Sequence, residues 1–134
     1  MPNYASYLVH LRVFIVQEVY AKKSEYFEDF QSPVAAYDCD GIIARANKKF
    51  RDFLGIAKED ISNGKINFFD YLDKENTMVA GYAHNAFGGE EKVTLNYSRY
   101  IRAAQKIDFP NAIFFPMTRD GDDVKLAGIL LDEK

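Results

Sequence analysis

The sequence has a single cysteine among its 134 residues, and this scarcity excludes several kinds of site. Cys39 alone can form no internal disulfide. One cysteine also cannot supply a zinc site built from several cysteines or the two-cysteine signature of c-type haem attachment. A chain without internal disulfides suits a reducing compartment, so we expect a cytoplasmic protein.

The sequence also lacks an excess of charge of one sign and a long apolar run. There are 17 Lys and Arg residues against 20 Asp and Glu residues, and the resulting net charge of −3 disfavours a nucleic-acid partner. The apolar stretch at 7–16 contains His10 and Arg12 and is shorter than the roughly 20 residues that cross a bilayer. We therefore predict no membrane insertion by this segment.

Signatures of common enzymes are missing as well. The sequence has no Walker-type phosphate loop and no Gly-x-Ser-x-Gly motif. Residues 88–91, Gly-Gly-Glu-Glu, are similar to the central motif of diguanylate cyclases, but Lys92 replaces the aromatic residue expected next and the chain is shorter than such a catalytic domain. We interpret these residues as a helix end before a strand. Asp70, Asp73 and Glu75 lie near an expected helix start, where negative charge is stabilising. We predict neither catalytic residues nor a metal site, so we do not expect the chain itself to be an enzyme.

The N-terminal part is predicted to be one long helix. Residues 4–30 contain no Gly or Pro, and their apolar residues recur at helical spacing. An alternative is a β-strand near 8–16, which is rich in β-branched residues. Two apolar stripes run along the helix, one formed by Tyr4, Leu8, Leu11 and Ile15 and the other by Val9, Val13, Val16, Tyr20, Phe27 and Phe30.

A helix that is apolar on two faces has to bury both of them, and one small domain usually covers only one. We therefore expect one stripe to cover its own domain and the other to contact a second copy of the chain. The predicted dimer interface consists of Leu8, Val9, Leu11, Val13, Ile15 and Val16.

Ser32-Pro33 interrupts the helical pattern, because proline cannot continue a helix and favours extended backbone in the residue before it. We divide the chain here into an N-terminal dimerisation and cap helix, residues 1–31, and a folded module, residues 32–134. The module begins with apolar runs on either side of a turn that contains Gly41, which predicts a β-hairpin. Asn47 then reads as the N-cap of a short helix.

The rest of the module is predicted to be helical first and extended later. The predicted elements are strands at 34–37 and 42–46, a helix at 48–54, helical turns at 57–61 and 68–72, a longer helix at 75–87, and strands at 93–97, 112–117 and 124–131. Residues 100–108 suit either a helical turn or an extension of the third strand. The last strand is the most apolar and suits the sheet centre, whereas Pro116 places the preceding strand near an edge or a bulge.

Several local motifs accompany this order of elements. They are Ser32-Pro33 before the first strand, Asp40-Gly41-Ile42-Ile43 in the first hairpin, Asn47 with Phe50 and Leu54-Gly55, and Glu59-Asp60-Ile61. Together they resemble the PAS (Per-Arnt-Sim) sensor family. The resemblance implies an α+β fold with a five-stranded antiparallel sheet, helices on one face, a long N-terminal cap helix and a cavity between sheet and helices.

The resemblance also implies a role in signalling, and it directs attention to the residues expected to line that cavity. Aromatic side chains would form most of the lining, and a few polar groups would orient a small molecule. The predicted ligand pocket consists of Tyr82, His84, Asn85, Asn96, Tyr97 and Phe114.

The sequence does not identify a cofactor. Some PAS proteins hold haem through a helix histidine, and His84 lies in the expected long helix. Because His84 stands alone, it is better interpreted as a histidine that holds no ligand. Flavin-binding PAS proteins carry an Asn-Cys-Arg-Phe motif on a helix, whereas Cys39 lies in a turn. The basic residues Arg45, Lys48, Lys49 and Arg51 are interpreted as a solvated helix face.

The expected function is that of a sensory module. It would homodimerise and couple a small-molecule or redox cue to an effector domain outside this chain, such as a histidine kinase, a cyclase or a transcription regulator. One alternative is a haem- or flavin-binding sensor that uses the inner cavity, and another is a dimerisation module that binds no ligand. The sequence stops where the last strand ends, as a fragment of a larger sensor would.

Overall fold

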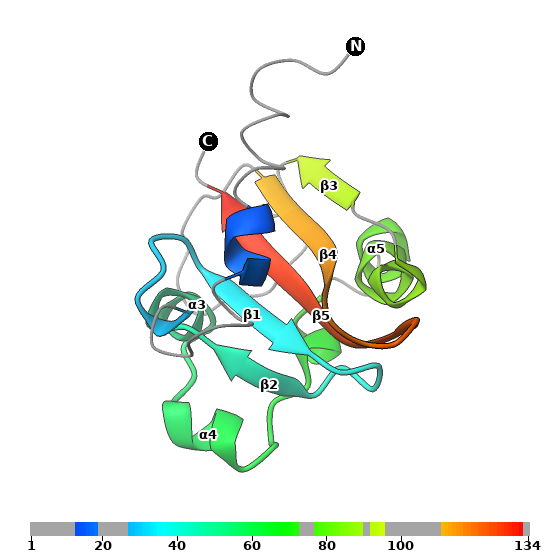
Figure 1. Ribbon diagram of the computed structural model, residues 1–134. Helices are drawn as coiled ribbons and strands as arrows, with labels where there is room; N and C mark the ends of the chain where they lie inside the picture. Colours follow the sequence, from blue (N-terminus) through cyan, green and yellow to red (C-terminus); the bar gives the residue numbers. More distant parts are fainter. Residues whose placement is uncertain (1–12, 19–26, 73–76, 90–91, 96–110, 133–134) are drawn as a thin grey trace.

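The computed structural model describes residues 13–18, 27–72, 77–89, 92–95 and 111–132. Its centre is a five-stranded antiparallel sheet with the strand order β2-β1-β5-β4-β3 (Figure 1). The strands are β1 (Val34–Tyr37), β2 (Ile43–Ala46), β3 (Lys92–Leu95), β4 (Asn111–Asp120) and β5 (Asp123–Asp132). This confirms the predicted α+β class, and the most apolar strand, β5, is the central one.

Helices lie between β2 and β3 in the chain. They are α3 (Lys48–Leu54), α4 (Lys58–Ser62), the 3-10 helix η1 (Phe68–Tyr71), α5 (Thr77–Asn85) and the 3-10 helix η2 (Ala86–Gly88). The predicted N-terminal helix at 4–30 falls only partly on the described residues, of which 13–18 and 27–28 are helical. None of the described helices combines the length and the apolar character needed to cross a membrane.

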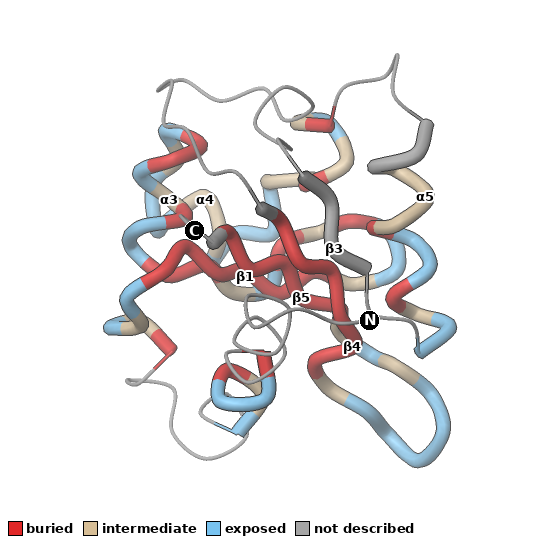
Figure 2. The backbone as a smooth tube through the Cα atoms, turned by 90° about the horizontal axis from the view of Figure 1, so that it is seen from above, coloured by how far each residue is buried: buried red, intermediate tan, exposed pale blue. Residues whose placement is uncertain are grey.

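The sheet has an apolar core on each face, because successive residues of a strand point to opposite sides. The inner core, under α3, η1 and α5, includes Ala35, Tyr37, Ile43, Phe50, Phe53, Phe68, Ala83, Ala86, Phe114, Ala127, Ile129 and Leu131. The outer core consists of Val13, Val16, Phe27, Val34, Ala36, Ile113, Phe115, Met117 and Leu130. Figure 2 shows the buried strands between α3–α5 and the segment 13–18.

Pro116 coincides with an irregularity of β4, as predicted. The register between β4 and β5 shifts between Pro116 and Thr118. β3 pairs with β4 only over 111–114, so Pro116, which has no N–H to donate, lies beyond the end of β3. Glycine is required opposite this region, because a Cβ on Gly128 would lie 2.6 Å from Cζ of Phe115.

Helix α4 begins without a side-chain cap, since the residue at its N-cap position is Ala57. We expect Ala57→Thr to stabilise the protein by about 0.5–1 kcal/mol, because a hydroxyl there accepts a hydrogen bond from an otherwise unpaired N–H of the first turn. Ala57→Val is the matched control, because valine has the same shape and no acceptor. Urea unfolding of the two variants measures the difference, and equal stabilities would contradict the expectation.

Candidate functional site

The space between the sheet and the helices is filled by aromatic rings around Tyr37. Its ring centroid lies 5.0 Å from that of Phe68, 5.9 Å from that of Phe69 and 5.8 Å from that of Phe87. The Tyr37 side chain is fully buried, and its hydroxyl donates a 2.7 Å hydrogen bond to the carbonyl oxygen of Ala83. This bond joins the end of β1 to α5.

Burial raises the pKa of Tyr37 well above its ordinary value of 10.0, because the phenolate would lose its hydration. The neutral phenol therefore contributes stability below about pH 10, and this contribution is lost as the pH rises further, when the unfolded chain ionises and the folded chain does not. We expect wild type to lose stability between about pH 9 and 11 more steeply than Tyr37→Phe. Chemical unfolding across this range measures the difference, and parallel curves would contradict it.

The predicted pocket residues do not converge on the interior. Phe114 is buried in the inner core, and Tyr82 is half-buried against it. His84 and Asn85 are exposed, because Ala83 and Ala86 are the positions of this helical stretch that face the sheet. Asn96 and Tyr97 lie outside the described residues.

The described residues do not fit a haem or a cysteine-linked flavin. The His84 ring packs on the ring of Phe69, with 4.4 Å between centroids, at the exposed side of α5. Cys39 is exposed in the first hairpin turn rather than on a helix. Within the described part of the chain, no three His, Cys, Asp or Glu side chains gather as a metal site would need.

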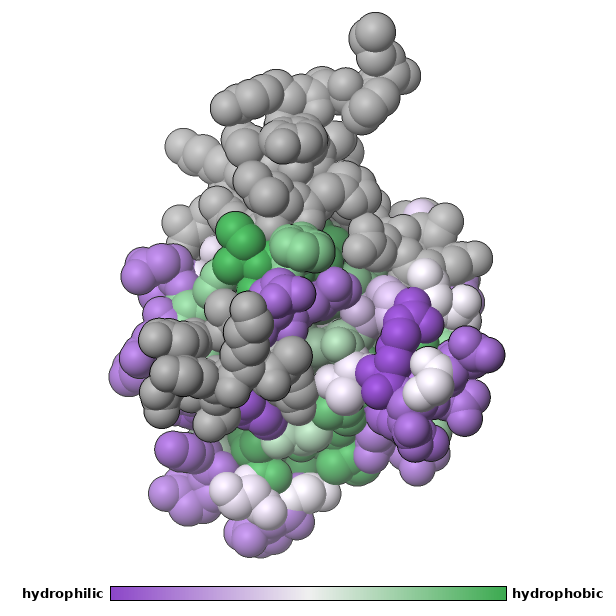
Figure 3. All heavy atoms as spheres, viewed as in Figure 1, coloured by the Kyte–Doolittle hydropathy of each residue, from purple (hydrophilic) through white to green (hydrophobic). Residues whose placement is uncertain are grey.

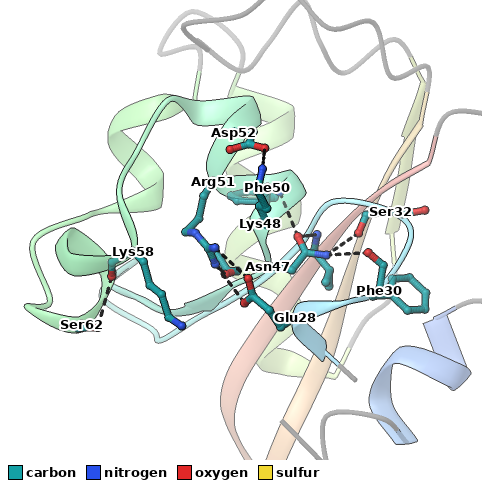
Figure 4. A network of polar contacts seen from close by, with 12 residues as sticks. Glu28, Phe30, Ser32, Asn47, Lys48, Phe50, Arg51, Asp52, Lys58 and Ser62 are labelled. Carbon is teal, nitrogen blue, oxygen red and sulfur yellow. Dashed lines mark hydrogen bonds and ion pairs between the residues drawn. The ribbon is translucent and has the colours of Figure 1, made fainter. Parts of the chain in front are cut away.

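Asn47 forms a fully buried polar junction, and its role as N-cap of α3 is confirmed. Its Oδ1 accepts hydrogen bonds from the N–H groups of Phe50 at 3.0 Å and Val34 at 3.1 Å. Its Nδ2 donates to the carbonyl oxygens of Ser32 at 2.8 Å and Phe30 at 3.2 Å (Figure 4). One amide therefore connects α3, β1 and the chain that arrives from the N-terminal segment.

A second junction lies beside Asn47 and was not foreseen from the sequence. Arg51 forms a bidentate ion pair with Glu28, with N–O distances of 2.8 and 3.1 Å, and its Nη1 donates to the carbonyl oxygen of Ala46 at 2.7 Å (Figure 4). The hydrogen bonds from Arg51 lower the pKa of Glu28. Only 12% of the Arg51 side chain is exposed, so the prediction of a solvated residue was wrong at this position. Lys48 is exposed and pairs with Asp52, which agrees with the prediction of a solvated helix face at that position.

A cleft of about 440 Å³ opens next to this ion pair. It lies between the end of the N-terminal segment, the edge strand β2 and α4. Its lining residues are Glu28, Asp29, Ala44, Arg45, Ala46, Arg51, Lys58, Ile61 and Ser62.

The helical segment 13–18 lies across the outer face of the sheet. Val13 and Val16 are buried in the outer core, and Nε2 of Gln17 donates a 2.7 Å hydrogen bond to the carbonyl oxygen of Pro116. Phe14 and Ile15 are exposed, by 60% and 45% respectively. Figure 3 shows an apolar area at this place on the surface.

This arrangement divides the predicted dimer interface. Val13 and Val16 pack on their own sheet, whereas Ile15 faces outward. Phe14, which belonged to neither predicted stripe, is exposed beside it. Leu8, Val9 and Leu11 lie outside the described residues.

Comparison with known proteins identifies the architecture. No family model matches the sequence, and no curated protein does. Among solved structures, a fungal LOV-domain photoreceptor matches with a TM-score of 0.56 and 14% identity over 91% of each chain. A domain of a sensory box sensor histidine kinase/response regulator from Geobacter sulfurreducens matches with a TM-score of 0.56 and 13% identity, over 90% of this chain and 96% of that one. The chain has the PAS fold.

The PAS-B domain of Drosophila melanogaster Cycle, with bound ethylene glycol, has the same fold. It matches with a TM-score of 0.53 and 11% identity over 72% of this chain and 94% of that domain. At such identities the agreement concerns the PAS fold and not the chemistry of any site. The functional residues of this PAS fold therefore have to be argued from its own side chains.

Proposed function

We propose that this PAS-fold chain is the non-enzymatic sensory module of a signalling protein, and that it homodimerises through the outward side of the segment 13–18. The observation that carries the proposal is the pair Phe14 and Ile15, which is exposed on a helical segment whose other side is buried on the sheet. Exposed apolar side chains that lie together favour association. In a two-fold dimer the same patch meets itself, so a single patch is sufficient.

The module would couple a cue to an effector domain outside this chain through the shared sheet. Leu130 belongs to the outer core under the segment 13–18, whereas its neighbours Ile129 and Leu131 belong to the inner core. A change of packing on the inner face of the sheet would therefore alter how the segment 13–18 packs on the outer face. Solved neighbours described as sensor histidine kinases favour a kinase among the candidate effectors, with a cyclase or a transcription regulator as alternatives.

The aromatic packing around Tyr37 favours a second candidate, a PAS module that dimerises without an interior ligand. Its fully buried side chain and satisfied hydroxyl offer no group to a ligand. A small molecule that raises the melting temperature would argue against this second candidate. The single cysteine supports a cytoplasmic location for either candidate.

Sedimentation equilibrium of the double variant Phe14→Asp/Ile15→Asp tests dimerisation. Burying a Phe or Ile side chain contributes about 1.5–3 kcal/mol, and each copy supplies one of each, so we expect dimerisation to weaken at least about 100-fold. Ala57→Asp adds an exposed carboxylate at the N-cap position of α4 and is expected to leave the dimer unchanged. A monomeric wild type at high concentration, or a double variant as dimeric as wild type, would refute the proposal.

A further inference from the structure

The cleft beside β2 has the size and the mixed lining of a small-molecule site. Its volume of about 440 Å³ falls in the range of ligand pockets. Ala44, Ala46 and Ile61 contribute apolar surface, and the rest of the lining is polar, with Ser62 as its uncharged member. The cleft is separate from the aromatic interior around Tyr37, since none of its lining residues belongs to that cluster of rings.

Positive charge prevails in the cleft. Its lining contains the cations Arg45, Arg51 and Lys58 against the carboxylates Glu28 and Asp29. Figure 4 shows the Lys58 side chain extending toward the pair formed by Glu28 and Arg51. Lys58 and Arg45 attract the Glu28 carboxylate in addition to Arg51. The chain therefore places one carboxylate of its own on Arg51, where Lys58 and Arg45 attract it as well.

Arg51 is prepared for a carboxylate independently of Glu28. Its Nη1 donates to the carbonyl oxygen of Ala46, and this bond to the backbone holds the guanidinium in place whichever anion faces it. A guanidinium presents two parallel N–H groups that match the two oxygens of a carboxylate, and the Glu28 pair already uses this geometry.

We propose that the cleft binds a small carboxylate, which replaces the Glu28 carboxylate on Arg51 and uses Lys58 as a second cationic contact. The carbon body of the ligand lies against Ala44 and Ile61. Glu28 is the internal competitor for this site, so ligand binding releases the residue that ties the end of the N-terminal segment to α3. The hydrogen bonds of Asn47 keep the following residues in place.

Such a ligand would be the cue of the module, and this part of the inference rests on the proposed function. Residues 27–30 and α3 are connected through Glu28 and Arg51, so the occupied cleft would change how firmly residues 27–30 are held against α3. The binding itself does not require a dimer.

Calorimetric titration with malonate, against sodium chloride at equal ionic strength, tests the site. Glu28→Gln removes the competing charge and is expected to bind malonate at least about 10-fold more tightly than wild type. Lys58→Met is expected to bind at least about 5-fold more weakly. Lys48→Met is the matched control, because Lys48 is an exposed lysine of α3 outside the cleft, and its affinity should equal that of wild type.

Three results would overturn the inference. They are a response to malonate no greater than that to chloride, equal losses in Lys58→Met and Lys48→Met, and equal affinity for inorganic phosphate, which would make the cleft a general anion site. The same titration on Phe14→Asp/Ile15→Asp separates the two proposals, because malonate should still bind to that variant if only dimerisation is lost. Circular dichroism confirms that each variant is folded.

Discussion

Replacing Asn47 with alanine is expected to destabilise the protein by about 4 kcal/mol. The side chain is fully buried, and its loss leaves the N–H groups of Val34 and Phe50 and the carbonyl oxygens of Phe30 and Ser32 without their partner. Each buried polar group left unpaired costs about 1–3 kcal/mol, with partial relief where water reaches it. Urea unfolding followed by circular dichroism measures the loss.

Asn63→Ala is the control, because Asn63 is exposed at the C-terminal end of α4, and we expect a change within about 0.5 kcal/mol. A loss of stability in Asn47→Ala no greater than in this control would contradict the role assigned to Asn47.

A second substitution at Asn47 separates its two tasks. In Asn47→Asp the carboxylate still accepts from Phe50 and Val34, so the cap of α3 survives, but it has no N–H groups for the carbonyl oxygens of Phe30 and Ser32. We expect hydrogen exchange to accelerate at 27–32 more than within α3. Uniform acceleration across both regions would show that the two tasks cannot be separated.

Phe68→Ala is expected to cost about 3–5 kcal/mol. Phe68 is fully buried between the sheet and the helices, where its ring centroid lies 5.0 Å from that of Tyr37 and 6.2 Å from that of Phe50. Removing the ring loses this contact area and leaves a cavity that rigid aromatic neighbours fill only in part.

Phe14→Ala is the matched control, because it makes the same chemical change at a side chain that is 60% exposed. Its effect on unfolding at low protein concentration, where dimerisation does not contribute, should stay within about 0.5 kcal/mol. Similar losses in the two variants would mean that the ring of Phe68 is not part of a packed core.

The sequence predicted best those features that local chemistry determines. Asn47 followed by an apolar helical pattern and Gly55 fixed the ends of α3, and Gly55 indeed adopts φ 72°. The bulge at Pro116 followed from its missing N–H group. The central position of β5 followed from its apolar composition, because only a strand with neighbours on both edges and cores on both faces can bury so many such residues.

Features that depend on distant contacts or on helical phase were missed. Glu28 and Arg51 lie 23 positions apart, and nothing in either neighbourhood indicates that they meet. His84 and Asn85 were assigned to the interior because they lie among aromatic residues, but in a short helical stretch a change of one residue rotates the side chain by about 100°. The predicted turn at 68–72 is a 3-10 helix, a form too short to leave a periodic signature.

The outer core has a consequence for how the PAS-fold unit is delimited. A boundary drawn at Ser32, where the family resemblance begins, would remove Val13, Val16 and Phe27 from the face formed by Ile113 and its neighbours. A chain truncated there would expose the apolar outer face of its sheet to water. Exposed apolar sheet faces of this kind associate with other copies and favour aggregation. We therefore expect the folding unit to extend upstream of Ser32 and to include the residues that cover the outer face.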